Sequence, residues 1–209
     1  MSEVIQGTDE WRALRAGKVT ASRIADMMAK TKTGYAASRT NYAAQLVAER
    51  LSGVMENGYS NAAMQWGKDN EADARVAYQF RTDKVVTEVG FVDHPSIPMS
   101  GCSPDGLVGD DGLVEIKAPN TATHINSLLD TKAPAGYLLQ MQWQLSCTGR
   151  KWCDFVSYDP RLPEAMQMVV FHVKRDDALI ADLEKHVLAF VEGIDATVTL
   201  LRSRYGEPA

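Results

Sequence analysis

A single stretch, residues 103–117, constrains the fold of this 209-residue chain more than any other. Its middle reads Gly-Asp-Asp-Gly between two short apolar runs, which is a strong signal for a hairpin turn. The sequence therefore predicts two antiparallel strands, at residues 106–108 and 112–117. The second strand is apolar at 113, 114 and 116 and is ended by Ala118-Pro119, so its charged residues are predicted to lie where a buried strand emerges.

Three charged side chains are predicted to converge on this hairpin. Asp105 opens it, and Glu115 and Lys117 lie two apart on its second strand, so these two point to one face while Ile116 points into the core. Two carboxylates and an ammonium at a sheet edge supply oxygen ligands for magnesium and a cation that orients or deprotonates water. Phosphodiester hydrolysis needs this combination, because water must be activated while negative charge grows on the leaving oxygen.

We therefore expect the Asp105 and Glu115 carboxylates and the backbone carbonyl of Ile116 to bind Mg²⁺, for which Mn²⁺ can substitute. Lys117 is expected to position the nucleophilic water or to stabilise the phosphorane charge. Neighbouring carboxylates favour a protonated Lys117 and burial favours a neutral one, so the sequence leaves its charge open. This is the PD-(D/E)xK pattern of nucleases, although the bare pattern also occurs by chance on solvent-exposed strands.

Length and composition predict one α/β domain over residues 1–209, and the order of the expected helices and strands favours a mixed central β-sheet flanked by helices. The chain is 45% apolar, which suffices for one sizeable core. Its net charge of −5 argues against coating nucleic acid by bulk electrostatics. Residues 1–50 hold eight Lys/Arg against five Asp/Glu, and residues 51–209 hold fourteen against twenty-two, which gives +3 and −8. This asymmetry suits a basic N-terminal segment that meets phosphate.

Cysteine usage and hydropathy indicate where the protein works. Its three cysteines lack the paired short spacings of a zinc site, which fits a reducing compartment. Since no run of 18 uncharged apolar residues occurs, neither export nor a membrane span is expected. These features predict a soluble protein in a reducing cytoplasm and no membrane partner.

Further elements follow from local periodicity and turn residues. A helix is predicted to start at Thr20-Ala-Ser22 and to end near Lys30, followed by a mobile loop over 31–40. The other expected helices are 42–51, 62–81, 137–147 and 177–202, and the other expected strands are 84–92, 152–158 and 166–172.

Four motifs spread along the chain resemble the lambda exonuclease, or YqaJ-like viral recombinase, family of PD-(D/E)xK nucleases. They are Trp11-Arg-Ala-Leu-Arg15-Ala-Gly17-Lys-Val-Thr20-Ala-Ser22; Trp66-Gly67-Lys68 with Glu71 and Asp73-Ala-Arg75; Cys102-Ser-Pro-Asp-Gly-Leu107; and Tyr158-Asp-Pro-Arg161. They occur in the same order as in lambda exonuclease across nearly the whole chain, which makes the resemblance far more specific than the three charged residues alone.

The resemblance implies two further active-site residues. Glu71 matches an additional acid, a metal ligand contributed by a helix that precedes the sheet; its alternative is an exposed helix carboxylate. Gln140 matches a glutamine beside the metal site, with Gln142 as the alternative alignment and a polar helix face as the alternative interpretation.

The resemblance also implies a pocket for the 5′-phosphate of DNA, formed by Arg15, Ser22 and Ser103, with Thr20 as a weaker candidate. A guanidinium and hydroxyls would supply its hydrogen bonds. The alternatives are a helix surface charge for Arg15 and a simple N-cap for Ser22.

A wedge that splits the terminal base pairs is the last site that the resemblance implies. Met64 falls near that position, with core packing as its alternative. The basic residue expected two positions earlier is Ala62 here, and the connection 121–136 is shorter than in lambda exonuclease.

For the whole protein the resemblance implies a homotrimeric ring around DNA and processive 5′ to 3′ digestion of one strand of a linear duplex, releasing 5′-mononucleotides. The resulting 3′ overhangs would serve a single-strand annealing protein in recombination, for a phage or prophage in the cytoplasm of a bacterial host cell. The alternatives are a structure- or sequence-specific DNA endonuclease of the same fold and a non-catalytic module that binds DNA ends.

Overall fold

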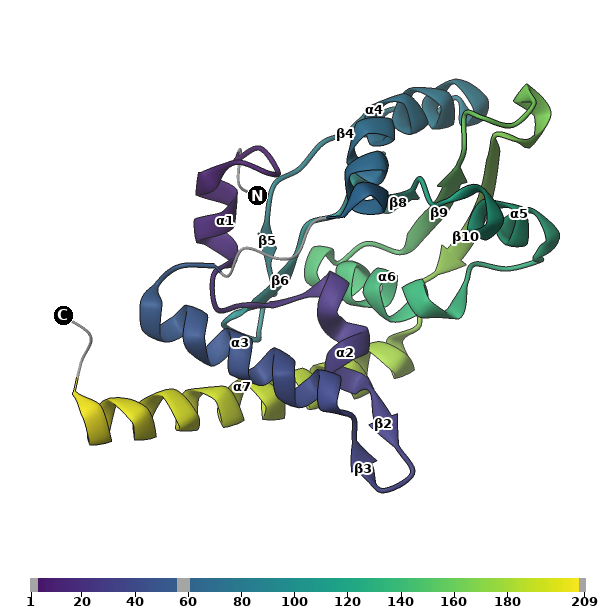
Figure 1. The fold of residues 1–209 in the computed structure, drawn as a ribbon. Coiled ribbons are helices and arrows are strands. Elements are labelled where there is room, and N and C mark those ends of the chain that lie inside the picture. Colours follow the sequence, from purple (N-terminus) through teal and green to yellow (C-terminus); the bar gives the residue numbers. More distant parts are fainter. Residues whose placement is uncertain (1–3, 56–60, 207–209) are drawn as a thin grey trace.

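The computed structural model of this protein describes residues 4–55 and 61–206. A five-stranded mixed sheet lies between helices, and a second group of helices packs beside it (Figure 1). The helices are α1 (Asp9–Arg15), α2 (Ile24–Met28), α3 (Ala37–Ser52), α4 (Ala62–Thr82), α5 (Thr121–Leu129), α6 (Ala135–Thr148) and α7 (Asp177–Tyr205), with 3-10 turns at Ala21–Arg23 and Glu164–Met166. The strands are β1 (Val19–Thr20), β2 (Lys30–Thr31), β3 (Gly34–Tyr35), β4 (Val86–Thr87), β5 (Val92–Asp93), β6 (Ser100–Cys102), β7 (Gly106–Val108), β8 (Gly112–Lys117), β9 (Trp152–Tyr158) and β10 (Met168–Lys174).

The five-stranded sheet has the order β10-β9-β8-β7-β4, and the predicted hairpin forms β7 and β8. Strands β8 and β9 are parallel and every other pair is antiparallel. Gly109 starts the turn with a φ of 53°, a left-handed conformation that glycine adopts without a steric penalty. The predicted mixed sheet with flanking helices is therefore present, and β8 lies at its centre.

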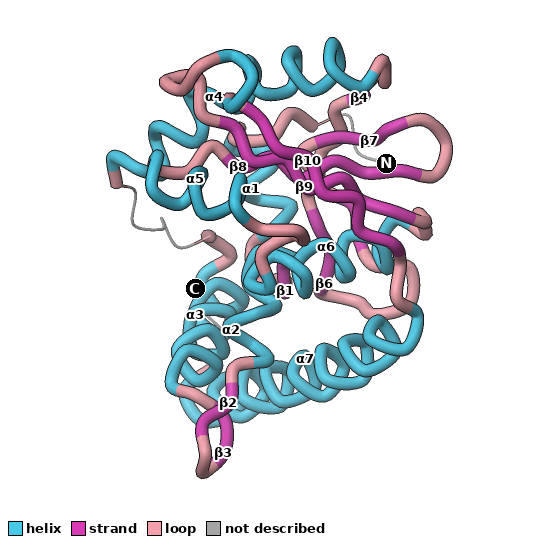
Figure 2. The backbone as a smooth tube through the Cα atoms, turned by 90° about the vertical axis from the view of Figure 1, so that its right-hand side faces the viewer, coloured by secondary structure: helices cyan, strands magenta, loops and turns pink. Residues whose placement is uncertain are grey.

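The two faces of this sheet are covered by different helices, with α4 on one face and α6 on the other (Figure 2). Successive side chains of β8 point alternately to the α4 face and the α6 face of the sheet. Val114 and Ile116 pack with Ala74 and Tyr78 of α4, whereas Leu113 packs with residues of α6. Odd-numbered residues of β8 therefore face α6, and this places Glu115 and Lys117 on the α6 side.

A second core holds the N-terminal segment against the C-terminal helix. Helices α3 and α7 lie side by side in both ribbon views (Figures 1 and 2), and α2 packs on both. A small sheet of order β1-β6-β5 joins this region to α6. Strand β6 leads directly to residues 103–105, so this core fixes the start of the predicted site. No helix within residues 4–55 or 61–206 is long and apolar enough to cross a membrane.

Two expectations from the sequence were wrong, and one helix was not predicted. Residues 31–40 are not a loop: they contain β3, the end of the β2–β3 hairpin and the start of α3, which begins at Ala37 rather than at 42. The Thr31 hydroxyl donates to the carbonyl of Gly34 at 3.2 Å and stabilises this turn locally. The expected strand 84–92 is two short strands in different sheets, β4 and β5. The connection 121–136 contains α5, which Asn120 caps by accepting from the Thr123 amide.

Two glycines give a matched test of this packing. Gly101 is in the middle strand of the small sheet, and an added Cβ would lie 2.4 Å from the carbonyl oxygen of Val92. We predict that Gly101→Ala lowers the free energy of unfolding by about 1–3 kcal/mol, since the clash is with backbone. Gly193 is in α7 with nothing within 4 Å of an added Cβ, so Gly193→Ala should raise stability by about 0.5–1 kcal/mol through helix propensity. Urea unfolding measures both, and equal stabilities of the two variants would contradict this packing.

Candidate active site

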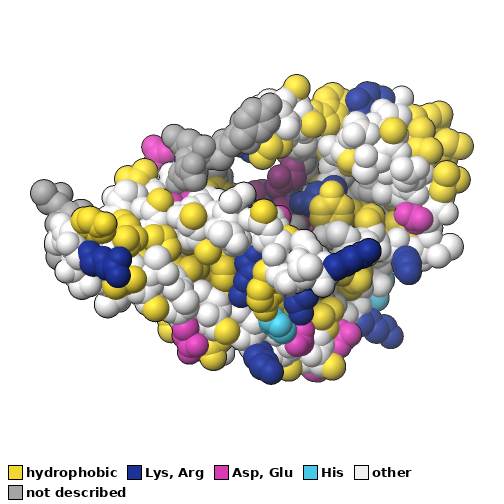
Figure 3. Space-filling model, turned by 60° about the horizontal axis from the view of Figure 1, so that its bottom comes forward, with side chains coloured by type: hydrophobic (Ala, Val, Ile, Leu, Met, Phe, Trp, Pro, Cys, Tyr) yellow, Lys and Arg dark blue, Asp and Glu magenta, His cyan; other side chains and the backbone are white. Residues whose placement is uncertain are grey.

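The structure brings the three charged side chains of the hairpin together. Glu115 has no exposed surface, and Lys117 forms a salt bridge to its Oε1. Asp105 lies beside the same strand, because its Oδ2 accepts a hydrogen bond from the Ile116 amide at 2.7 Å. Two carboxylates and one ammonium therefore converge at one end of β8. The surface in Figure 3 is hollowed at a place where acidic and basic side chains lie next to one another.

Two glutamines of α6 complete the surroundings of Glu115. Gln140 donates from Nε2 to Oε1 at 2.5 Å, and Gln144 donates from Nε2 to Oε2 at 2.6 Å. Gln142 points elsewhere, to the Lys174 carbonyl and the Asp176 amide, so Gln140 is the residue that lies at the site. Gln144 was not predicted, although its spacing of four from Gln140 on a helix places both on one face and could have indicated it.

The charges at this site do not balance. Burial, followed by the nearby Glu115 carboxylate, raises the pKa of Asp105 well above its ordinary value. Burial lowers the pKa of Lys117, but the Glu115 and Asp105 carboxylates outweigh that effect, so its net pKa is raised and the ammonium stays protonated. A protonated Lys117 balances the charge of the buried Glu115 carboxylate. An ionised Asp105, which is half-buried, would leave one negative charge uncompensated, so the site has room for further positive charge.

A divalent cation of the magnesium type fits this donor set. Carboxylate oxygens are its preferred protein ligands, and a cation beside Asp105 would favour the ionised form that burial opposes. Within the described part of the chain, no three His, Cys, Asp or Glu side chains are close enough to form a metal group by themselves. Main-chain oxygen and water would therefore complete the shell, as is usual for Mg²⁺.

Glu71 approaches the same site from α4. Its carboxylate is close enough to Asp105 to contribute to the raised pKa of that residue. Arg75, one turn further along α4, donates to Glu71 at 3.0 Å and also pairs with Glu88. Glu71 is half-buried rather than free on a helix surface, and Arg75 restrains its orientation toward the sheet.

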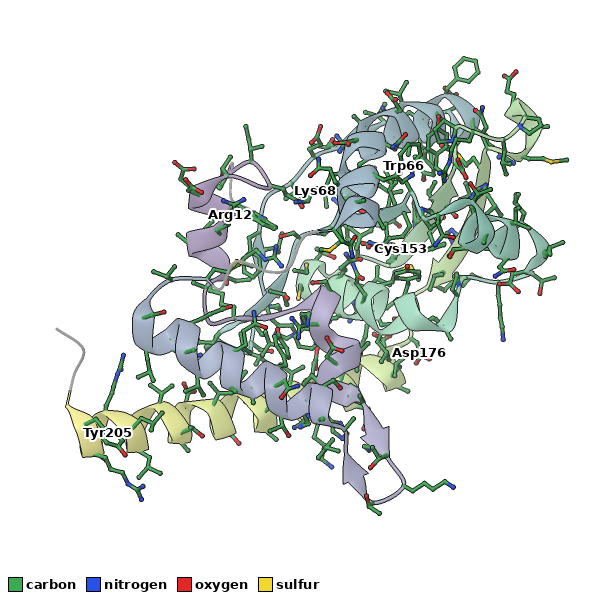
Figure 4. All side chains as sticks on the ribbon, viewed as in Figure 1. Arg12, Trp66, Lys68, Cys153, Asp176 and Tyr205 are labelled. Atoms are coloured by element: carbon green, nitrogen blue, oxygen red, sulfur yellow. The ribbon has the colours of Figure 1, made fainter. Side chains whose placement is uncertain are left out.

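Two of the sequence motifs meet where α4 approaches the sheet. The Arg161 guanidinium lies 4.3 Å from the centroid of the Trp66 ring and donates twice to the Asp159 carboxylate. Hydrogen bonds to Arg161 and Thr121 outweigh the effect of burial and lower the pKa of Asp159 to about 2. Trp66 lies on the first half of α4 (Figure 4), so this contact fixes the helix that carries Glu71.

Trp11 links two of the residues that were predicted to bind phosphate, Arg15 and Ser103. The Trp11 indole N–H donates to the Ser103 hydroxyl at 2.9 Å, and the Arg15 guanidinium stacks 3.9 Å from the centroid of the Trp11 ring. Arg15 Nε is buried and has no hydrogen-bond partner among the described residues. Burial lowers the pKa of Arg15, although a guanidinium remains charged near neutral pH. A half-buried cation with an unused donor suits an anionic ligand.

Thr20 and Ser22 lie close to each other, with 3.5 Å between their hydroxyl oxygens. Ser22 is exposed and Thr20 is buried. Tyr42 connects them to the pocket, because its hydroxyl accepts from the Thr20 amide at 3.0 Å and its ring is near enough to Arg15 for each to influence the pKa of the other. The structure places all four predicted phosphate-binding residues in this N-terminal region and in the adjacent segment before Asp105.

Helix α3 fixes the turn that follows Arg15. The Gly17 amide donates to Glu49 Oε2 at 2.8 Å, and Arg50 Nε donates to the Gly17 carbonyl at 2.8 Å. Gly17 has a φ of +70°, and a Cβ there would lie 2.5 Å from Arg50 Cγ. These contacts hold the loop between α1 and β1 in one conformation, and the sequence analysis did not find them.

Met64 lies on the first turn of α4 with half of its surface exposed, so the alternative of core packing is wrong. Ala62, at the position where the resemblance leads to a basic residue, is exposed as well. The adjoining residues 56–60 are outside the described residues.

Comparison with known proteins identifies the family. Residues 10–151 match the model of the YqaJ-like viral recombinase domain, and the chain belongs to this family. The similarity extends to solved structures of exonucleases. An alkaline exonuclease, LHK-Exo from Laribacter hongkongensis, is 52% identical with a TM-score of 0.89, covering 97% of this chain and 100% of that chain. LHK-Exo in complex with dAMP is 53% identical with the same TM-score and coverage.

A phage-related exonuclease from Haemophilus somnus 129PT is 13% identical, with a TM-score of 0.72 over 88% of this chain and 96% of that chain, and supports the fold alone. A comparison with curated protein sequences found no match. The predicted fold class and the family resemblance are thus confirmed, and the chain is a homologue of an alkaline exonuclease.

Proposed function

We propose that this protein is a Mg²⁺-dependent exonuclease that digests one strand of linear double-stranded DNA from its 5′ end and releases 5′-mononucleotides. The observation that carries the proposal is the adjacency of the anion pocket and the carboxylate site. Ser103 and Asp105 are two residues apart, so their Cα atoms are separated by at most about 7 Å. A single nucleotide can bridge such a distance, with its 5′-phosphate at Arg15 and its 3′ side at Asp105.

Each residue then has a role in hydrolysis of the first phosphodiester bond. Asp105 and Glu115, with the Ile116 carbonyl, would hold Mg²⁺, which supplies Lewis-acid stabilisation of the phosphoryl oxygens and lowers the pKa of water. Glu71 would reach the metal ion through water, because the three carboxylates do not form a metal group by themselves. Lys117, held protonated by its two carboxylate neighbours, positions the attacking water or offsets the charge on phosphorus. Water attacks phosphorus, the bond to the O3′ of the terminal nucleotide breaks, and that oxygen takes up a proton.

The polarity of digestion follows from the pocket at Arg15. A guanidinium next to hydroxyl groups binds phosphate through charge-assisted hydrogen bonds. Ser103 faces this pocket through Trp11, and Thr20 and Ser22 supply two further hydroxyls. Because hydrolysis leaves a new 5′-phosphate on the shortened strand, the product of one cycle carries the group that the pocket binds in the next.

The relatives support the class of reaction. LHK-Exo is an alkaline exonuclease, and its complex holds dAMP, a mononucleotide of the kind that this reaction releases. Within the proposal, the protein acts as a homotrimeric ring in the cytoplasm and passes its 3′ overhangs to a single-strand annealing protein. Enclosure of the duplex would let weak phosphate contacts suffice on a chain of net charge −5. Met64, exposed at the start of α4, is the proposed wedge between the terminal bases.

The direction of digestion is tested with linear duplexes that are labelled at the 5′ or the 3′ end, next to covalently closed circles, in Mg²⁺ or EDTA. We predict that 5′ label is released first as a mononucleotide, that circles stay intact, and that EDTA abolishes the reaction. Lys117→Ala and Asp105→Asn should lose all detectable cleavage and still bind DNA ends, because neither residue contributes to the phosphate pocket. Cleavage of closed circles would instead show an endonuclease, and full activity of both variants would refute the site.

The role of Arg15 is tested with a matched pair on α1. Arg15→Ala should reduce the preference for 5′-phosphorylated over 5′-hydroxyl ends by about tenfold or more. A loss of this size is what removal of one charge-assisted hydrogen bond produces. Arg12 is on the same helix, but it is exposed and pairs with Asp9. Arg12→Ala should therefore leave the preference unchanged. The measurement is the ratio of initial rates on the two substrates, and an identical ratio in all three proteins would exclude Arg15 from phosphate binding.

A further inference from the structure

Gln144 is buried as completely as the carboxylate that it contacts. Neither Gln144 nor Glu115 has any exposed surface, and the 2.6 Å hydrogen bond between Nε2 and Oε2 lies inside the molecule. The carboxylate fixes the orientation of the amide, because the reverse orientation would place two oxygen acceptors against each other.

The other end of the Gln144 side chain is unsatisfied. Its Oε1 is buried and has no hydrogen-bond partner in the described part of the chain. A buried acceptor without a partner costs about 1–3 kcal/mol, so an apolar side chain of the same size would be the better choice for packing alone. The stabilising contribution of Gln144 therefore lies in its single bond to Glu115.

The three hydrogen-bond donors around Glu115 are distributed unequally over its two carboxylate oxygens. Lys117 and Gln140 both donate to Oε1, whereas Oε2 accepts only from Gln144 among the hydrogen bonds of the described residues. With Oε1 alone held, the carboxylate could still rotate about its Cγ–Cδ bond, a torsion that is intrinsically broad. The bond from Gln144 restricts this rotation.

We propose that Gln144 is a positioning residue that holds the Glu115 carboxylate in one orientation toward a divalent metal ion bound beside Asp105. The inference rests on the proposed function, since it requires that Glu115 is a metal ligand. Hydrogen bonds to ligating carboxylates are the usual means by which a protein orients them, and their loss weakens metal affinity.

Gln142 provides the matched control. It is on the same helix and is 2% exposed, and its side chain also makes hydrogen bonds in the interior, to the Lys174 carbonyl and the Asp176 amide. Replacing it disturbs a buried glutamine of α6 without touching Glu115. Methionine is the replacement for both positions, because it has a similar length and flexibility and lacks a donor.

The test measures Mn²⁺ binding without DNA, from the loss of the electron paramagnetic resonance signal of free Mn²⁺. Gln144→Met should raise the dissociation constant by about 10–100-fold, and Gln142→Met should leave it at the wild-type value. Thermal unfolding in EDTA shows that each variant is folded. If Gln144→Met does not fold, Gln144→Asn replaces it: the amide remains but is one methylene too short to reach Oε2, and the same weakening is expected.

The outcomes separate this inference from the proposed function. If the wild-type protein binds Mn²⁺ and a folded Gln144 variant binds it equally well or more tightly, the positioning role is refuted while the nuclease site stands. Equal weakening in the Gln142 and Gln144 variants would also refute it, because the effect would then come from general disturbance of α6. If the wild-type protein does not bind Mn²⁺, the metal-dependent function is refuted and the positioning role with it.

Discussion

A fully buried carboxylate, that of Glu115, is the constraint on which the rest of this structure depends. An isolated ionised group inside a protein is very costly, and it is tolerated where an opposite charge and hydrogen-bond donors surround it. Lys117 supplies the charge from the same strand, and α6 supplies two amide donors. The position of α6 against β8 is therefore determined by the site as well as by apolar packing.

A place suited to a cation lies next to this carboxylate. Burial, followed by the nearby Glu115 carboxylate, raises the pKa of Asp105, and a cation beside Asp105 would favour its ionised form. Arg15, which is linked to Ser103 through Trp11, is a half-buried cation whose Nε is a buried donor without a partner among the described residues. The site thus has one part suited to a metal ion, at Asp105, and another suited to a phosphate, at Ser103. These two residues are two apart on the segment that connects β6 and β7.

Local signals in the sequence were sufficient for the centre of the site. The hairpin, its turn glycine and the two-residue spacing of Glu115 and Lys117 depend on neighbours in the chain, and they were predicted correctly. The helix that carries Glu71 also has a long and regular pattern, and α4 begins and ends within one residue of the prediction. Turn chemistry and periodicity are strongest in segments of this kind.

Contacts between segments that are far apart in the sequence could not be predicted from such local signals. The small β1-β6-β5 sheet is built from strands of two or three residues, too short to show alternation, and their pairing depends on the fold. Glu49 and Arg50 form hydrogen bonds with Gly17 across more than thirty residues of sequence, so no local pattern predicts them. His124 is buried against Ser157, 33 residues away, and no local pattern predicts that contact either.

We propose that Asp105 and Glu115 together bind a divalent cation at the end of β8. Anomalous X-ray diffraction from crystals soaked in Mn²⁺ locates such a cation. We expect an anomalous peak within coordination distance of both carboxylates, with Lys117 and the Ile116 carbonyl beside it. Density that shows Mn²⁺ bound only elsewhere, or these carboxylates unchanged and without metal at saturating Mn²⁺, would contradict it.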